Sequence, residues 1–274
     1  MALYSNTLAV VRQHLSSAVG DLITGTFDSG DTNNAVDTML RKGDDYYNEH
    51  HYRCYIYEGT NIGEEREVSD WVNSTNSLTL EPGFTDSVDT TTDYELHYIF
   101  TEDEYRKAIN MAISSIADDY LLDAVDTNKT FSTGIYEYAM PTSPEFEFVH
   151  RVTRETTAAG DVFRDEDIID PSFYKFILVG SASYIKFDEE KYKITSTENG
   201  KDMRIEGQQR QSALTSDTSI CYLPLDWIIY KAITFLPNSK IMSSKLDKTL
   251  EIALSFVANM PVKRPYPKSK RVVL

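Results

Sequence analysis

Hydrophobic residues recur at helical spacing near the start of the chain, which predicts a first amphipathic helix of about five turns. Its apolar face comprises Leu8, Val11, Leu15, Ala18, Val19 and Leu22. Ser5 and Asn6 are the candidate N-caps, and Gly20 marks the end of the helix. The residues that follow, 24–51, are polar and rich in Asp, Asn and Gly, with a short helix indicated near 35–41.

The segment Phe100–Tyr105 has the pattern of a capped helix start. Thr101 is positioned to cap the amide of Glu104, Glu104 to reach back to Thr101, and Phe100 to pack on Tyr105. We therefore expect a helix over 102–123, with an apolar face formed by Tyr105, Ala108, Ile109, Ala112, Ile113, Ile116 and Tyr120.

Two more helices are expected near the C-terminus. Pro224 precedes the largely apolar run 225–236, and Pro237 stops it. Ser244 is the expected N-cap of a last helix, whose apolar residues are Leu246, Leu250, Ala253, Leu254 and Val257.

Alternating and short apolar runs predict strands in two other regions. The first region, 52–100, contains a strand, a glycine-bounded loop and a second strand over 55–71, followed by a polar turn and the strand 78–80. The second region contains predicted strands at 136–140, 145–153, 173–180, 184–187 and 201–207.

These elements predict an α+β protein with a helical core built from segments distant in sequence. An antiparallel β module is inserted into that core, and a second β-rich segment precedes the last helices. The expected boundaries are 1–23 (N-terminal helix), 24–100 (inserted β module), 101–130 (core helix), 131–222 (second β-rich segment), 223–260 (C-terminal helices) and 261–274 (extended basic tail).

The charge balance argues against a protein that binds nucleic acid. Lys and Arg total 27 against 43 Asp and Glu, which gives a net charge of −16, whereas phosphate contacts need clustered cations. Residues 261–274 differ from the rest, because they carry cations and no acid. This tail is either a solvated basic end or a docking peptide.

The N-terminus lacks a basic start and a long apolar run, so no signal peptide is expected. No segment approaches ~20 apolar residues, and we expect a soluble protein made in the cytoplasm. Cys54 and Cys221 show no zinc spacing and are expected to be buried, reduced thiols.

A search for catalytic patterns predicts no enzyme, no cofactor and no metal. Gly59–Gly63 lacks the lysine of a phosphate loop, and the histidines are isolated apart from His50 and His51, which are expected to point apart on a strand. Asp28–Asn34 reads as an Asx-rich turn, because it lacks the order of a calcium loop. The acids of Asp161–Asp167 suit a glycosidase only if held at a set separation across a sugar.

The chain contains 18 Tyr, 12 Phe and 2 Trp. Half-buried strands account for about half of them, because aromatic residues favour strands. Tyrosine is also enriched at protein interfaces. A cluster comprising Tyr46, Tyr47, Tyr52, Tyr55 and Tyr57 is therefore expected to be partly interfacial.

One pattern resembles a hairpin module of tailed-bacteriophage virion proteins. It comprises Glu58-Gly59-Thr60, Gly63-Glu64, Arg66, Val68 and Trp71, then the Leu-Thr-Leu strand 78–80 and Pro82-Gly83-Phe84. Residues 201–210 and 222–236 are similar to the strand, loop and helix that end phage neck and head-to-tail connector proteins.

The resemblance implies a head-to-tail adaptor in the virion neck, assembled in the host cytoplasm. Such a protein forms a homo-oligomeric ring, commonly of twelve subunits, that docks on the portal protein and meets a tail or further neck protein. Double-stranded DNA passes through the channel without specific binding, which suits an acidic wall.

Two sets of contact residues are expected on this basis. The basic tail is predicted to dock on the portal through Lys263, Arg264, Tyr266, Lys268, Lys270 and Arg271. The hairpin is predicted to touch the next subunit or the tail through Tyr55, Tyr57, Arg66 and Trp71.

Three alternatives stay open at the sequence level. The chain is another phage structural protein, such as a tail terminator or hub; or a carbohydrate- or receptor-binding module that stacks sugars on exposed Tyr residues and Trp71; or a hydrolase that uses the acids of Asp161–Asp167.

Overall fold

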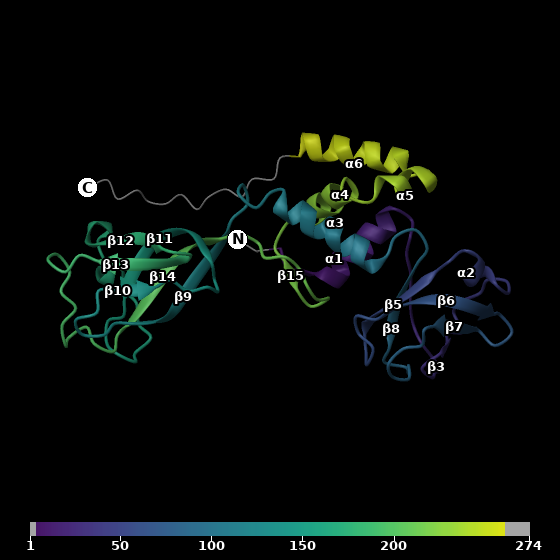
Figure 1. Cartoon of the computed structure of the whole chain (residues 1–274), viewed down its shortest axis with the longest axis horizontal. Helices are drawn as coiled ribbons and strands as arrows, with labels where there is room; N and C mark the ends of the chain where they lie inside the picture. The colour runs from purple at the N-terminus through teal and green to yellow at the C-terminus, as the bar shows by residue number, and fades with distance from the viewer. Residues whose placement is uncertain (1–3, 261–274) are drawn as a thin grey trace. The chain divides into compact units, whose positions relative to one another are not determined.

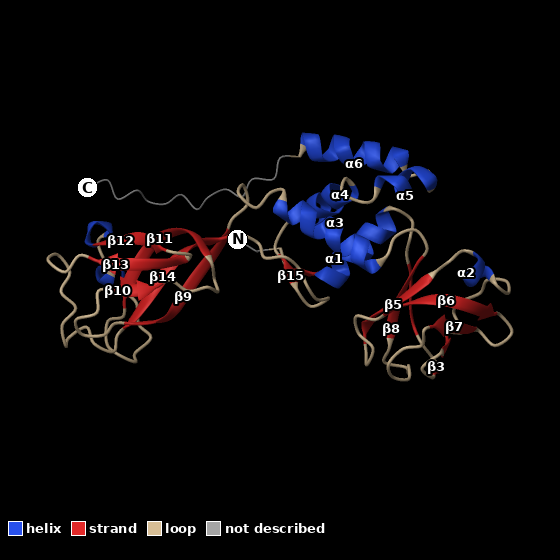
Figure 2. Ribbon diagram, viewed as in Figure 1, coloured by secondary structure: helices blue, strands red, loops and turns tan. Residues whose placement is uncertain are grey.

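The computed structural model describes residues 4–260, which form two compact units (Figure 1). Among these residues, unit 1 comprises 4–116 and 212–260, and unit 2 comprises 117–211. Helices and antiparallel sheets occur together, so the predicted α+β class is confirmed (Figure 2). No helix of the described part is long and apolar enough to cross a membrane.

The helices of unit 1 come from both ends of the chain and pack together, as predicted. α1 (Leu8–Ala18) packs on α3 (Glu102–Ser114) and on α4 (Leu225–Ile233). α4 also packs on α6 (Asp247–Asn259), and the short α5 (Asn238–Ser243) precedes α6. The apolar face of α1 therefore packs on two helices that are distant in sequence. α3 follows the β module, and α4 follows unit 2.

The start of α3 confirms the predicted capping box and staple. The amide of Glu104 donates to Thr101 Oγ1 at 3.2 Å, and the amide of Thr101 donates to Glu104 Oε2 at 2.9 Å. The rings of Phe100 and Tyr105 lie 5.5 Å apart. α1 also has a side-chain cap, but from Thr7 and not from Ser5 or Asn6.

Asn6 lies instead in strand β1 (Asn6–Thr7), which pairs with β15 (Ile220–Cys221). α1 ends at Ala18, and Gly20 follows at φ 73°, as its predicted role at the helix end requires.

α3 is shorter than predicted, because Leu122 and its successors alternate as a strand. β9 (Leu122–Thr130) buries Leu122, Ala124 and Asp126 and turns the residues between them outward, which is a period of two. The expected helix over 102–123 therefore ends at Ser114, and unit 2 begins well before residue 131.

The predicted cap at Ser244 is also wrong. Ser244 is the C-terminal flank of α5, and Lys245 follows at φ 59°. This left-handed residue separates α5 from α6, which starts after Leu246 without a side-chain cap.

The inserted β module of unit 1 is a seven-stranded sheet with the order β2-β8-β5-β6-β7-β4-β3. Its strands are β2 (Ile23–Thr26), β3 (Ser29–Gly30), β4 (Asn34–Val36), β5 (Arg53–Glu58), β6 (Glu65–Val72), β7 (Ser77–Glu81) and β8 (Asp93–His97). Phe27, Tyr47, Trp71 and Tyr94 are among the large residues of its core.

The helix indicated near 35–41 is absent from this module, because Asp28 and Asp37 hold that segment in turns. The amide of Thr38 donates to Asp28, and the amide of Met39 donates to Asp37. The module's short helix is α2 (Tyr46–Glu49).

Unit 2 contains two three-stranded antiparallel sheets, of order β11-β14-β9 and β10-β13-β12. Besides β9, the strands are β10 (Glu137–Ala139), β11 (Phe146–Arg154), β12 (Tyr174–Val179), β13 (Ala182–Phe187) and β14 (Asp202–Gln209). All five strands predicted for this region are present, and two 3-10 turns (Asp165–Asp167, Pro171–Phe173) lie between β11 and β12. The core contains Phe131, Val152, Ile185, Phe187, Met203 and Ile205.

Candidate functional site

A buried charge network lies where the β module of unit 1 joins the helices, and Arg12 of α1 is its centre. The Arg12 side chain is 0% exposed. Its Nε and Nη2 donate to the two carboxylate oxygens of Glu95 at 2.8 and 2.9 Å, and its Nη1 donates to Asp217. The guanidinium also lies over the ring of Tyr55, 4.3 Å from its centroid. α1 is thereby tied to strands β5 and β8 and to the segment before β15.

His97 of β8 extends the network on the far side of Glu95. Its Nε2 lies 2.9 Å from Glu95 Oε2, and its Nδ1 lies 2.7 Å from the carbonyl oxygen of Asp21. Because a carbonyl and a carboxylate both accept, both ring nitrogens donate when the imidazole is charged. Although burial lowers the pKa of His97, these two acceptors dominate and raise it above its usual value.

The Glu95 carboxylate is held in its charged form. Burial raises its pKa, but hydrogen bonds from His97 and Arg12 and their positive charges lower the pKa further, to about 2. Two donors therefore compensate a buried acid that is itself 0% exposed.

Asp21 fixes the turn between β8 and α3. Its carboxylate accepts from the amides of Tyr98, Ile99 and Phe100 at 2.7–2.9 Å, and from the Tyr105 hydroxyl at 2.7 Å. The residues that connect the β module to the capped start of α3 are thus held by one buried carboxylate.

A cavity of about 290 Å³ opens beside the network, and residues of unit 1 line it. Tyr55, Glu102, Arg106 and Asp217 supply its charged and phenolic groups, with hydroxyls from Thr215, Ser216 and Thr218. Glu102 Oε1 lies 3.2 Å from Arg106 Nε, and the Tyr55 hydroxyl donates to Asp217 at 2.8 Å. The charged and phenolic groups of the lining are therefore engaged in internal pairs.

The network's groups hold elements of unit 1 together. Burial raises the pKa of the Tyr55 hydroxyl and of the Cys54 thiol well above their ordinary values, so both stay protonated. His97 is buried with both nitrogens engaged. Within residues 4–260, no group of three or more His, Cys, Asp or Glu is placed to hold a metal ion.

The hairpin residues that carry the phage resemblance lock the β5–β6 loop to the segment after β7. Arg66 Nε donates to the carbonyl of Gly83 at 3.0 Å, and the Arg66 guanidinium lies 5.7 Å from the Phe84 ring centroid. Glu64 accepts from Arg66 Nη2 at 2.6 Å and from the amide of Thr85 at 3.1 Å. These residue types at this spacing are therefore accounted for by contacts within the module.

The structure gives Trp71 and Tyr55 internal roles in place of the expected inter-subunit contact. Trp71 is 0% exposed and donates from Nε1 to the carbonyl of Lys42 at 3.2 Å. Tyr55 is 5% exposed and belongs to the Arg12 network. Tyr57 and Arg66 are half-buried, so they retain some surface.

The expected interfacial tyrosine cluster is largely a core cluster as well. Tyr47 and Tyr52 are buried and pack edge to face, with ring centroids 5.2 Å apart. Tyr47 packs in the same way on Trp71. Only Tyr46 and Tyr57 of this set are half-buried.

Several other predicted features have plain structural outcomes. Cys54 and Cys221 are buried and free, as predicted. Asp31 accepts from the amides of Asn33 and Asn34 at 2.7 Å, which is the predicted Asx turn. His50 and His51 lie after α2 and not on a strand.

The acids proposed for a hydrolase are mostly bound to nearby residues. Asp167 pairs with Arg154 at 2.7 Å and accepts from the Thr156 hydroxyl at 2.6 Å. Glu166 pairs with Arg164 at 3.1 Å on the surface. These bonds lower the pKa of Asp167, the opposite of what a general acid needs.

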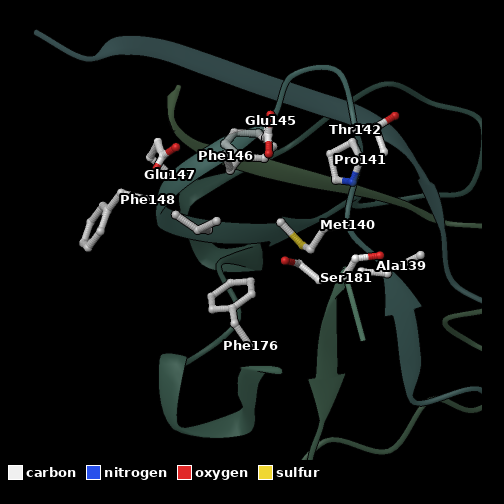
Figure 3. A pocket seen from close by; sticks show the side chains of 13 residues that line it. Ala139, Met140, Pro141, Thr142, Glu145, Phe146, Glu147, Phe148, Phe176 and Ser181 are labelled. Carbon is white, nitrogen blue, oxygen red and sulfur yellow. The ribbon is translucent and has the colours of Figure 1, made fainter. Parts of the chain in front are cut away.

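Unit 2 carries an open groove of about 770 Å³ (Figure 3). Met140, Phe146, Val149 and Phe176 are among its apolar lining residues. Phe148 is also in the lining, but its ring turns away from the groove (Figure 3).

The predicted portal-docking residues lie outside the described residues: Lys263, Arg264, Tyr266, Lys268, Lys270 and Arg271. The sequence analysis in turn missed the buried network. One signal was available, since Arg12 lies on the same face as Leu8, Val11 and Leu15, and a cation inside an apolar face indicates a buried partner.

Comparisons with known proteins do not assign the chain to a family. A scan against models of protein families gives no match, and a search of curated proteins gives none either.

Proposed function

We propose that this protein is a structural subunit of a tailed-bacteriophage virion, a head-to-tail adaptor that assembles as a ring and docks on the portal protein. The observation that carries the proposal is the anchoring of the inserted β module. The module that contains the resembling hairpin is fixed to the helices through Arg12, whose side chain is 0% exposed and bridges Glu95 and Asp217.

This anchoring suits a structural subunit that holds its neighbours in position better than it suits an enzyme. Packed elements joined by a fully paired buried network hold one orientation, because removing any partner leaves an uncompensated charge. A projection held in this way keeps its contact surfaces in register from one subunit to the next. An acidic chain of net charge −16 also suits a channel through which DNA passes without binding.

The carbohydrate-binding alternative has less support. Sugar stacking needs exposed aromatic faces, whereas Trp71 and Tyr55 are buried in unit 1. The same burial leaves a tail terminator or hub possible, because such proteins are also assembled from rigid parts. We retain the adaptor as the first choice on the resemblance of residues 201–210 and 222–236.

Electron microscopy of the purified full chain, alone and mixed with the portal ring of the same phage, tests the proposal. In the mixture, we expect rings with a central channel that stack on the portal. A variant with Lys263, Arg264, Lys268, Lys270 and Arg271 replaced by Ser should keep the fold but lose portal binding. A chain that neither forms rings nor cosediments with the portal would contradict the adaptor role.

A further inference from the structure

β12 of unit 2 is an edge strand whose side chains are almost all apolar and mostly exposed. Its sequence is Tyr-Lys-Phe-Ile-Leu-Val, and it pairs only with β13 among the described strands. Phe176 is 45% exposed, Leu178 71% and Val179 54%. An edge strand presents a row of backbone N–H and C=O groups, and apolar side chains beside that row favour pairing with another chain.

The other three edge strands of unit 2 carry features that discourage such pairing. β10 has three residues only. β11 shifts register at Phe146/Phe148 and again at Val149/Arg151, and such bulges disrupt an edge. β9 turns polar residues such as Thr127 and Asn128 to its exposed surface. β12 has an unbroken register with β13 and a single charge, Lys175.

We propose that β12 pairs antiparallel with β12 of a second copy of this chain, with Ile177 opposite its own counterpart. This register places Phe176 opposite Leu178, and Lys175 opposite Val179, in both halves of the pair. Two three-stranded sheets thereby become one six-stranded sheet across a two-fold axis.

The choice of register follows from the two faces of the β12–β13 hairpin. Phe176 is paired with the buried Ile185, so Phe176 and Leu178 lie on the face that covers the core. Directly opposite side chains share one face of an antiparallel pair, and a shift by one residue would put Phe176 on the wrong face. In the proposed register, Phe176 and Leu178 of both copies form one apolar cluster.

A second copy fits this strand better than an unrelated one because the strand is self-complementary. The only charged residue, Lys175, lies near one end, so the two lysines of the pair fall four positions apart and oppose apolar residues. Phe176 also lines the groove of unit 2, so the merged cluster continues into apolar surface from Met140 and Phe146. The pairing thus covers apolar area that a single chain leaves open.

A cysteine on the proposed axis tests the register directly. Opposite Cα atoms in an antiparallel pair lie about 4.5–5.5 Å apart, within reach of a disulfide. Ile177→Cys should form a disulfide-linked dimer on mild oxidation of the full chain. The native Cys54 and Cys221 should not interfere, because both are buried in the folded chain. The matched control Val179→Cys should stay monomeric on a non-reducing gel, because its thiols would be about 13 Å apart along the strand.

Equal cross-linking of both cysteine variants, or of neither, overturns the register. The contact itself is tested by light scattering of the full chain over a range of concentrations. We expect wild-type dimers, a loss of at least tenfold in dimer affinity for Leu178→Lys, and no change for Val125→Lys, an apolar position of β9 with 55% exposure.

A monomeric wild type, an assembly that survives Leu178→Lys, or open-ended aggregation without a discrete dimer overturns the inference. The inference concerns the free chain and does not depend on the adaptor role. A two-fold dimer has no polarity, so it must separate before the chain joins a ring that docks on the portal by one face. The dimer can therefore fail while portal binding holds, and the reverse.

Discussion

The two β-rich regions of this chain differ in how completely their ion pairs are buried. The β module of unit 1 meets its helices through buried charges, with Arg12, Glu95 and His97 all 0% exposed. Unit 2 has ion pairs that are only partly buried, such as Arg154 (28% exposed) with Asp167 (7%) and Glu198 (10%), and it leaves apolar side chains of β12 exposed. The inserted module has its partner within the chain, whereas the partner proposed for unit 2 is a second copy of the chain.

The largest expected effect comes from Arg12→Met, which removes the shared partner of Glu95 and Asp217. Breaking a buried pair of this kind costs about 3–5 kcal/mol. Both tryptophans, Trp71 and Trp227, lie in unit 1, so tryptophan fluorescence during urea unfolding reports that unit alone.

The matched control for Arg12→Met is Arg151→Met in unit 2, whose partner Glu206 lies near the surface. We expect it to leave the tryptophan transition in place. A loss below about 1 kcal/mol for Arg12→Met would mean that the network adds little to unit 1.

The free energy of unfolding of unit 1 should fall at low pH, where Glu95 is protonated, and at high pH, where His97 loses its proton. The pKa of Glu95 falls from 4.5 to about 2 on folding, so its contribution is present above pH 4.5 and is lost as pH falls toward 2. By linkage, that contribution is on the order of 3 kcal/mol. The pKa of His97 rises from 6.5, so its contribution is present below 6.5 and is lost as pH rises through the folded pKa.

Tryptophan-detected unfolding between pH 3 and 9 measures both slopes. His97→Gln should remove the decline above pH 6.5 and keep the decline at low pH. A wild-type midpoint that is flat over the whole range would contradict the pairing of His97 with Glu95.

A smaller effect is expected from Thr101→Ala, which removes the cap of α3. The loss of one N-cap costs about 1 kcal/mol, and the amide of Glu104 is left with water as its partner. Thr101→Ser keeps the hydroxyl and should restore most of the stability in the same urea titration. Equal losses for the two variants would show that the methyl group, and not the cap, matters at this position.

The smallest effect is expected in unit 2, at the exposed pair of Lys186 and Glu137. Their charged groups lie 3.3 Å apart on neighbouring strands, both well exposed. Exposed pairs contribute about 0–1 kcal/mol, and salt weakens them. We therefore expect Glu137→Gln to change the free energy of unfolding of unit 2 very little. At high salt, the change should be smaller than the experimental error when unfolding is followed by circular dichroism.

Local patterns predicted the parts of the fold that depend on near neighbours. The capping box at Thr101, the helix after Pro224 and five of the six described strands of unit 2 each follow from residues within one element, whereas β9 was not predicted. The end of α3 was missed because Leu122 suits either a helix or a strand until its partner β14 is known.

The charge network could not be predicted in the same way. Arg12 and Asp217 are separated by 205 positions, and no local spacing relates them. The aromatic residues misled for a similar reason: Trp71 and Tyr55 read equally well as surface or core until the fold shows which side of the sheet is covered.

The 205-residue separation of Arg12 and Asp217 also sets an order of events during synthesis. The ribosome releases Arg12 early, but its second carboxylate arrives only after all of unit 2 has been made. Domains generally fold as units while the chain grows. Unit 2 can therefore complete its core while unit 1 still waits for residues 212–260, so a segment made late decides when the first part of the chain is finished.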